Sequence, residues 1–247
     1  MKLKDYKHFF AGTSNVELPV PNKAHFPEAY QQKSRLHYYA SLFRTVEINS
    51  TFYKIPMPRT VARWAADVPD HFRFTFKLWQ GITHAKGLYY DKADMAAFMA
   101  AVAPAAEKKG CLLVQFPASL TSVYFARLQQ LLADIQQQQQ SWPIAVEFRH
   151  RSWYTDKAYQ LLEKHAATLV IHDMPNSSTP LADIGTDLVY LRFHGEKGKY
   201  GGSYDNSFLV EYATYIKDWL QEKKTVYAYF NNTMGAAVQN LTTLNNL

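Results

Sequence analysis

The sequence has little of what marks several common protein classes. It holds a single cysteine, Cys111, so no disulfide can form within the chain, and a reducing cytoplasm is the expected compartment. No apolar run approaches the length of a membrane span, and the opening MKLKDYKHFF lacks the apolar stretch of a secretory signal. The sequence therefore predicts a soluble, cytoplasmic protein with no membrane partner.

Several catalytic and cofactor-binding signatures are missing too. The chain has no GxGxxG dinucleotide fingerprint, no GK[ST] phosphate loop, no HExxH metal motif and no GxSxG nucleophile elbow. Ser14 and Ser50 fall near predicted strand ends, but without an elbow they give weak support for serine-triad chemistry. We therefore predict no obligatory organic cofactor.

The composition is that of a globular protein with a mild excess of positive charge. Hydrophobic residues make up 47% of the 247 residues, and no break in composition divides the chain, so we expect one domain, residues 1–247. The formal charge of +6 favours anionic partners, but the basic residues are scattered. Weak, sequence-independent nucleic acid binding is the most that this charge predicts. No pattern indicates an oligomeric state.

Eight short runs rich in β-branched and aromatic residues predict strands. They are residues 8–14, 45–50, 72–78, 111–117, 144–150, 168–173, 188–194 and 225–231. Most are separated by segments with apolar residues at helical spacing, such as 95–102 with Asp91 as N-cap, and only the connection 173–187 lacks this pattern. The alternation predicts a single (β/α)8 TIM barrel. A doubly wound open sheet is the alternative, weakened by the missing fingerprint.

The run IAVEFRH, residues 144–150, shows how such a strand would divide into two faces. Alternate side chains point in opposite directions, which puts Glu147 and Arg149 on one face and three apolar residues on the other. Because helices should cover the outside of a parallel barrel, the polar face must lie inside it. The acid and the base either form a self-satisfying buried ion pair or belong to a functional site.

Polar residues recur at the C-terminal ends of most predicted strands, the face where barrel enzymes carry their active sites. We predict Glu47 and Glu147 as a general acid and base pair, with His194 as a proton shuttle near neutral pH. The predicted substrate-binding residues are Asn49, Tyr53, Lys77, Gln115, Arg149, Trp153, Asp173, Arg192, Asn231 and Asn232.

The charges predicted inside the barrel do not balance. Lys77, Arg149 and Arg192 outnumber Glu47 and Glu147, so an anionic ligand would restore neutrality, with arginine offering a bidentate fork to carboxylate or phosphate. The alternative is a scaffold of internal salt bridges with one spare base.

A second anion-binding hypothesis rests on the last two strand-to-helix loops. The run GEKGKYGG (195–202) is glycine-rich and basic, and Asn231, Asn232 and Thr233 directly precede the last predicted helix. Loops after strands seven and eight form a recurrent phosphate site in these barrels. The alternative is a surface lid.

Residues of metal-ligand type also fall near strand ends. They are His84, Glu147, His150, His172, Asp173 and His194. They lack tight ligand spacing, and Arg149 and Arg192 would repel a cation. We predict no metal site, and a bound divalent metal would favour a phosphodiester-cleaving protein instead.

Seven motifs follow one another along the chain. They are GTS (12–14), VEINSTFY (46–53), FKLWQGITH (76–84), QFPASL (115–120), VEFRHRSWY (146–154), YLRFHG (190–195) and FNNTMGAAVQN (230–240). Their order resembles the YecE-like family, catalogued as domain of unknown function 72. The resemblance implies a TIM-barrel-type fold and brings no established reaction. The family's first loop usually continues after GTS with Gly and Trp, where this chain has Asn15 and Val16, which predicts a specialised or partly lost rim.

The preferred interpretation is an enzyme acting by acid–base chemistry on a phosphorylated or other anionic small molecule. The alternatives are a nucleic-acid-binding or metal-dependent phosphodiester-cleaving protein, indicated by the basic balance and an aromatic rim, and a non-catalytic barrel that binds a ligand or partner. One fold hosts many chemistries, so the site must decide.

Overall fold

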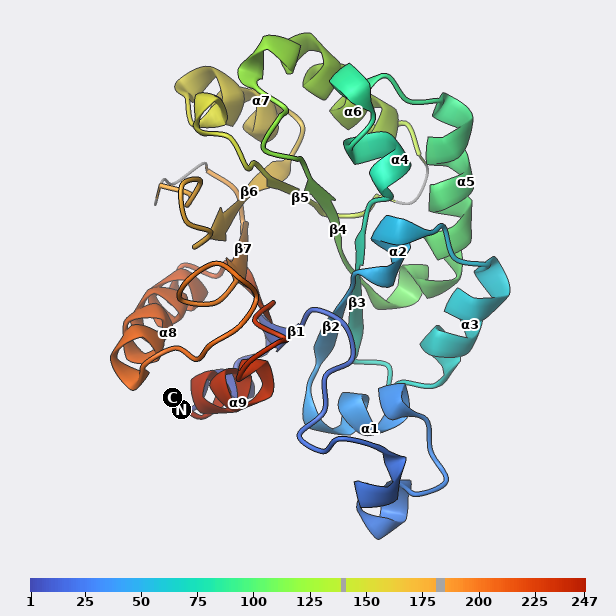
Figure 1. Ribbon diagram of the computed structural model, residues 1–247, viewed down its shortest axis with the longest axis vertical. Helices are drawn as coiled ribbons and strands as arrows, with labels where there is room; N and C mark the ends of the chain where they lie inside the picture. Colours follow the sequence, from blue (N-terminus) through green and yellow to red (C-terminus); the bar gives the residue numbers. More distant parts are fainter. Residues whose placement is uncertain (139–140, 181–184) are drawn as a thin grey trace.

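A ring of eight parallel strands forms the centre of the protein (Figure 1). The computed structural model describes residues 1–138, 141–180 and 185–247, and in it the strands follow chain order around the ring, with β1 beside β8. The strands are β1 (Phe9–Thr13), β2 (Thr45–Ile48), β3 (Arg73–Lys77), β4 (Lys109–Gln115), β5 (Ile144–Glu147), β6 (Ala167–His172), β7 (Leu188–Phe193) and β8 (Thr225–Phe230). The predicted TIM-barrel architecture is confirmed.

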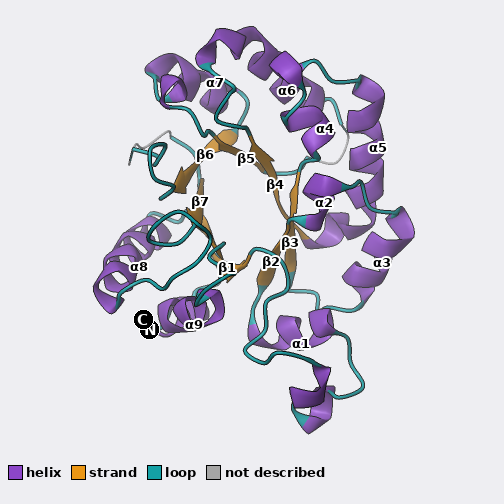
Figure 2. Cartoon of the chain, viewed as in Figure 1, coloured by secondary structure: helices purple, strands orange, loops and turns teal. Residues whose placement is uncertain are grey.

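Helices surround the strand ring on its outer side (Figure 2). They are α1 (Arg35–Leu42), α2 (Ser50–Tyr53), α3 (Pro58–Ala66), α4 (Gln80–Thr83), α5 (Lys92–Val102), α6 (Phe125–Gln136), α7 (Asp156–Lys164), α8 (Asn206–Gln221) and α9 (Ala237–Asn246). Asp91 caps α5 as predicted, by accepting a hydrogen bond from the backbone N–H of Ala93. The one-turn helices α2 and α4 escaped prediction because four residues are too few for a periodic pattern.

The connection predicted to lack a helix is only partly described. Residues 173–180 contain no helix, as expected, and residues 181–184 lie outside the described part of the chain.

Each strand turns alternate side chains into the ring and against the helices. The inward cluster of apolar and aromatic residues contains Phe10, Cys111, Leu113, Ala145, Val170, Tyr190, Tyr227 and Tyr229. Ile144, Val146 and Phe148 pack instead in the larger core beneath the helices, so β5 divides as predicted. Cys111 is fully buried, and burial raises the pKa of its thiol. Its sulfur is therefore a packing group.

The barrel closes at a narrow seam between β1 and β2. A Cβ atom on Gly12 would lie 2.1 Å from the carbonyl oxygen of Thr45, so glycine is what allows the two backbones to approach. Beyond it a single parallel bridge joins Ser14 to Glu47, and the N–H of Asn15 donates to the carbonyl oxygen of Glu47 at 2.7 Å. The ring is nearly closed, and the seam ends at the site described below.

The two ends of the chain lie side by side near α9 (Figure 1). The ammonium group of Lys4 donates to the side-chain oxygen of Asn246 at 3.0 Å, which joins the start of the chain to its last helix. In the described ranges no helix has both the length and the apolarity to cross a membrane.

Candidate functional site

The ends of β2, β5 and β7 bring two carboxylates and one arginine together inside the barrel. Glu47, Glu147 and Arg192 all point inward, as the alternation of their strands predicted. The two carboxylates are fully buried and Arg192 is 1% exposed. No bulk water reaches these charges, so the protein itself must satisfy them.

Arg192 bridges the two carboxylates. Its Nε and Nη2 donate to the two oxygens of Glu47 at 3.0 and 2.7 Å, and its Nη1 donates to Oε2 of Glu147 at 2.6 Å. Hydroxyl groups complete the shell, because Ser14 and Tyr190 each donate to Glu47 at 2.6 Å. Arg149 donates to the remaining oxygen of Glu147. The result is a charge layer of two carboxylates and two guanidinium groups that balance one another.

This charge layer fixes both carboxyl groups in the ionised form. Burial opposes ionisation of Glu47, but the charge and hydrogen bonds of Arg192 outweigh it and lower the pKa. Burial also opposes ionisation of Glu147, and there Arg149 and Arg192 together hold the pKa well below its usual range. Neither group carries a proton to donate at neutral pH, so the geometry opposes the predicted acid and base pair.

His194 lies in the charge layer as a neutral ring. Its Nε2 sits 2.8 Å from Nη2 of Arg149 and 3.2 Å from Nη1 of Arg192. Arginine only donates hydrogen bonds, so Nε2 must be an acceptor and the proton must reside on Nδ1. Nδ1 faces Oδ1 of Asp173 at 3.4 Å. Burial, together with the two arginine charges, lowers the pKa of His194 to about 4. The arrangement opposes a proton shuttle that works near neutral pH.

Asp173 anchors the glycine-rich loop that follows β7. One of its oxygens accepts from the backbone N–H of His194 at 2.8 Å, and the other accepts from the hydroxyl of Tyr204. Tyr204 accepts in turn from the N–H of Gly195 at 2.6 Å. Farther along the loop, the N–H groups of Gly198 and Tyr200 donate to carbonyl oxygens of the same segment. These amides are used internally, which gives the predicted phosphate loop no support from their geometry.

Lys77 stands apart from the charge layer. It ends β3 on the inward face, and its Nζ lies 4.1 Å from the centre of the Phe52 ring, which belongs to α2. Among the described residues no carboxylate forms an ion pair with it. Burial, with the charges of Arg192 and Arg149, lowers its pKa to about 8 against the opposing pull of Glu147 and Glu47. In the described part of the chain, Lys77 is thus a partly desolvated cation that no carboxylate contacts.

His84 packs against an aromatic ring at the mouth of the barrel. The sequence indicates it only as a residue of metal-ligand type, but its ring lies edge-on to Phe52, with the ring centres 4.9 Å apart, directly after α4. Burial and the charges of Lys77 and Arg149 lower its pKa to about 4, so the ring is neutral beside Lys77. No sequence signal marks this position, because α2 and α4, which bring Phe52 and His84 together, are too short to give a periodic pattern.

Trp153 and Asn232, both predicted to bind a ligand, are instead fully buried. Trp153 is fully buried, stacked on Phe148 at 4.8 Å, and its indole N–H donates to the carbonyl oxygen of Leu120 at 2.7 Å. It packs in the core and cannot stack on a ligand. Asn232 is also fully buried, and its amide donates to Gly202 and Asn240, which ties the loop after β7 to α9.

Arg192 was predicted to bind the ligand, but its contacts in the structure oppose that role. It lies at the predicted place, but its guanidinium is committed to Glu47 and Glu147 and is closed to an incoming anion. Arg149 differs, because its side chain is 12% exposed and only its Nε and Nη2 have protein partners among the described residues. Of the two arginines, Arg149 is the one that a ligand can reach.

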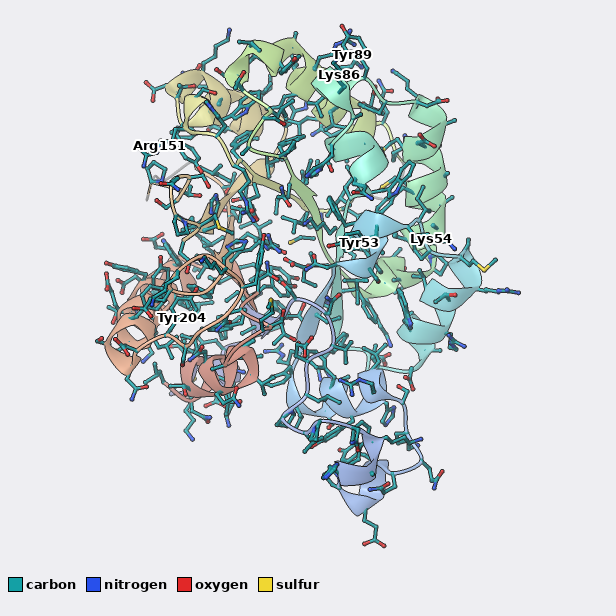
Figure 3. All side chains as sticks on the ribbon, viewed as in Figure 1. Tyr53, Lys54, Lys86, Tyr89, Arg151 and Tyr204 are labelled. Atoms are coloured by element: carbon teal, nitrogen blue, oxygen red, sulfur yellow. The ribbon has the colours of Figure 1, made fainter. Side chains whose placement is uncertain are left out.

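The remaining predicted residues lie at or near the mouth. Tyr53 is 69% exposed on α2 (Figure 3), and the side-chain oxygen of Asn49 is buried without a hydrogen-bond partner among the described residues. Gln115 uses its amide N–H on the carbonyl oxygen of Phe116 at 2.7 Å. Asn231 directly follows β8 and is buried. Tyr53 packs edge-on against Phe52, the ring that Lys77 contacts.

The rim beside β1 is altered in a way the structure explains. Asn15 adopts a left-handed backbone, with φ of 64°, a conformation that asparagine tolerates better than most residues other than glycine. Its side-chain oxygen accepts from the backbone N–H of Asn49 at 3.2 Å. Next to it lies a cavity of about 230 Å³ lined by Asn15, Val16, Leu36, Ile48, Ser50 and Trp64. The turn is kept, and space remains beside Val16.

The metal-ligand types do not converge. In the part of the chain that the structure describes, no group of three or more His, Cys, Asp or Glu side chains could hold a metal ion. His172 uses both ring nitrogens internally, since Nε2 lies 2.9 Å from the carbonyl oxygen of Phe148 and Nδ1 accepts from Met174 N–H at 3.2 Å. Metal independence itself stays a prediction.

Comparison with known proteins places the chain in a family. Residues 10–247 match the model described as "Protein of unknown function DUF72". The chain belongs to the DUF72 family. It is 28% identical to the UPF0759 protein YunF of Bacillus subtilis, over 85% of this chain and 84% of that protein. An 84-residue stretch is 36% identical to YecE of Escherichia coli, covering 34% of this chain and 31% of YecE.

Solved DUF72 structures share the fold along nearly the whole chain. A DUF72 protein from Enterococcus faecalis superposes with a TM-score of 0.79 at 26% identity, covering 97% of this chain and 96% of the other. One from Thermotoga maritima gives 0.77 at 26% identity, with 96% and 97% covered. These DUF72 relatives support the barrel, and their names state no reaction, so the function must be argued from the mouth itself.

Proposed function

We propose that this protein is an enzyme that binds a small anionic molecule, such as a phosphorylated one, at the C-terminal mouth of the barrel and acts on it by acid–base chemistry. The observation that carries the proposal is Lys77, an inward cation that no carboxylate neutralises among the described residues. A desolvated charge without a partner is costly, and the lowered pKa of Lys77 records that cost. A bound anion would remove it.

The neighbours of Lys77 suit such a ligand. Arg149 offers the free part of a guanidinium fork, which matches phosphate or carboxylate geometry. Phe52 provides apolar surface beside the ammonium group, and Tyr53 packs edge-on against Phe52. Together these groups form one binding side of the mouth, between β2, β3 and β5.

Proton transfer in this proposal shifts from the glutamates to Lys77. A general acid or base works best when its pKa lies near the working pH, and the pKa of Lys77 is about 8. Glu47 and Glu147 are hydrogen-bonded to Arg192 and transfer no proton in this proposal. Their charges raise the pKa of Lys77 and so partly oppose the effect of burial. Arg149 and Arg192 are both bound to these carboxylates, so few positive side chains at the mouth are available to contact a nucleic acid backbone. Weak nucleic acid binding therefore stays a secondary prediction.

A thermal unfolding series tests the anion site. Phosphate should stabilise the parent by mass action, by about 2.7 kcal/mol at a hundredfold excess over Kd, compared with chloride at equal ionic strength. Lys77→Met should lose the response while unfolding no earlier than the parent without phosphate. Lys157→Met is the matched control, because Lys157 also lies over a phenyl ring, that of Phe125 at 4.3 Å, but is exposed on α7. A parent without a phosphate response would end the proposal.

The acid–base part needs its own readout. Sugar phosphates and 2-oxo acids, incubated with the protein in heavy water, should exchange a C–H proton for deuterium with a pH profile that bends near 8. Lys77→Arg should keep phosphate binding and lose the exchange. Exchange that persists in this variant would remove Lys77 from the chemistry.

A further inference from the structure

We propose that Lys77 is also a covalent nucleophile, whose Nζ forms an imine with the carbonyl carbon of a small molecule that carries a carboxylate or phosphate group. The inference rests on the proposed anion site, because the anionic group would be held beside the amine by Arg149. It names the substrate class as oxo-anions, such as 2-oxo acids or phosphorylated aldehydes and ketones.

The placement of the amine supports this role. Lys77 is the last residue of β3, where it pairs with Leu113 of β4. Its carbonyl oxygen also accepts a hydrogen bond from the hydroxyl of Thr51 on α2 at 2.7 Å, so the backbone of Lys77 is held on both sides. Its Nζ faces the Phe52 ring at 4.1 Å and has no carboxylate ion-pair partner in the described residues. An amine tied into a salt bridge would be protonated and unreactive, whereas this one is fixed in position without such a tie.

The charged groups around Lys77 favour the neutral amine. Arg192 on β7 and Arg149 on β5 disfavour its protonation, while Glu147 and Glu47 favour it less strongly than burial and the arginines oppose it. His84 on α4 is neutral and adds no charge. With a pKa of about 8, the free-amine fraction at pH 7 exceeds that of an unperturbed lysine on the order of a hundredfold.

The chemistry balances without a further reactant. The lone pair of Nζ forms a bond to the carbonyl carbon, and the carbonyl oxygen takes a proton to give a carbinolamine. Loss of that oxygen as water, with the second amine proton, leaves a C=N bond. One amine and one carbonyl thus give one imine and one water. The protonated imine then withdraws electrons from the neighbouring carbon, which labilises its C–H or C–C bond.

The alternative to a reactive amine is that Lys77 only packs on the Phe52 ring. A lysine stacked on a phenyl ring can simply cover it, as Lys157 covers Phe125 on the surface. Lys77 differs in lying half-buried on the inward face at the end of a strand, where the charges of Arg192 and Arg149 act on it. Lys157, in contrast, is exposed on the outer helix α7.

Reductive trapping tests the proposal. The intact protein is treated at pH 7 with glyoxylate and borohydride, which convert an imine into a stable carboxymethyl-amine, and the modified lysines are located by peptide mass spectrometry. Lys77 should be labelled at least tenfold faster than Lys157. Propionaldehyde, a neutral aldehyde, should label Lys77 more slowly than glyoxylate does, and added phosphate should slow the glyoxylate reaction. The rate at Lys77 should rise with pH to a plateau above about 8.

The outcomes separate this inference from the proposed function. Phosphate stabilisation of the parent and of Lys77→Arg, with Lys77 labelled no faster than Lys157, would overturn the imine and leave the anion site standing. Fast labelling of Lys77 by both aldehydes, unaffected by phosphate, would overturn the anionic substrate class while keeping the reactive amine. Selective labelling by glyoxylate, lost in Lys77→Arg and kept in Lys157→Arg, supports the inference.

Discussion

The protonation state of each ionisable side chain at the mouth depends on how deeply it is buried and on which charges and hydrogen-bond partners surround it. Glu47 and Glu147 are buried but saturated with donors, so they stay charged. His194 is buried among arginine donors, so it stays neutral. Lys77 is half-buried beside a ring, and desolvation with the arginine charges lowers its pKa to about 8. Residues of similar chemistry thus divide into scaffold and candidate ligand contacts.

The two arginines should respond differently to removal. Arg192→Met would leave Glu47 buried with no cation in contact, so we expect a loss of roughly 3–5 kcal/mol in the free energy of unfolding. Arg149→Met should cost much less, because Glu147 keeps Arg192 and the site of Arg149 is partly open to water. Urea unfolding of both variants measures the difference. Equal losses would show that Arg149 is scaffold as well.

Acid should destabilise the protein from near pH 6.5 downward, partly through His194. The pKa of this ring is about 4 when folded and about 6.5 when unfolded, so between these values the unfolded chain binds more protons. Stability therefore falls as pH drops through that window, by on the order of 3 kcal/mol for this group. Asp173, Glu147, Arg149 and Arg192 are the charges that face it.

The matched variants are His194→Gln and His25→Gln. Glutamine can still accept from the arginines but does not titrate, so the loss between pH 6.5 and 4 should shrink in His194→Gln. His25 is exposed, and His25→Gln is the surface control for the same change of residue type. Unfolding free energies measured across this range decide, and an identical slope in all three proteins would mean that His194 is not held neutral.

Among the secondary-structure elements, two single-turn helices and the β1–β2 seam build the proposed binding side of the mouth. Helix α2 carries Phe52 and Tyr53 (Figure 3 labels Tyr53 there), and His84 directly follows α4. The Phe52 ring contacts Lys77 on one side and the His84 ring on the other. Lys86 and Tyr89 lie at the outer edge of the same view. The seam contributes Asn15, which holds the backbone of Asn49.

Asn15 should be replaceable by glycine but not by alanine. Its φ of 64° lies in the left-handed region, which costs an alanine about 1–2 kcal/mol and costs glycine little. Asn15→Gly and Asn15→Ala both lose the hydrogen bond to Asn49, so the difference between their unfolding free energies isolates the backbone. Equal stability of the two variants would mean that the turn relaxes to another conformation.

At the scale of the whole molecule, much of the barrel followed from the sequence. Strand composition and helical spacing placed all eight strands, and period-two alternation pointed Glu47, Glu147 and Arg192 inward. These patterns are local, so they survive without knowledge of neighbours. Alternation gives the direction of a side chain but not its distance from side chains on other strands. Arg192 forms hydrogen bonds with both glutamates, and these contacts join strands that are far apart in the sequence.

The errors have the same origin. Trp153 follows β5 just as a rim residue would, but a 3₁₀ turn over Arg151–Trp153 directs it into the core against Phe148. His84 was undervalued because α4 is too short to show in a periodic pattern. Both depend on how one turn is folded, and turns of this length carry little sequence signal.

Among the described residues no carboxylate pairs with Lys77, and the titration of this lysine is the most direct test of whether its cation binds an anion. In protein carrying ¹³C-labelled lysine, the side-chain Cε resonance of Lys77, assigned by Lys77→Arg, should titrate near pH 8. Saturating phosphate should move that midpoint upward, because a bound anion favours the ammonium form. A midpoint near 10.4, the value of an unperturbed lysine, that phosphate leaves in place would mean that Lys77 is neither desolvated nor part of an anion site.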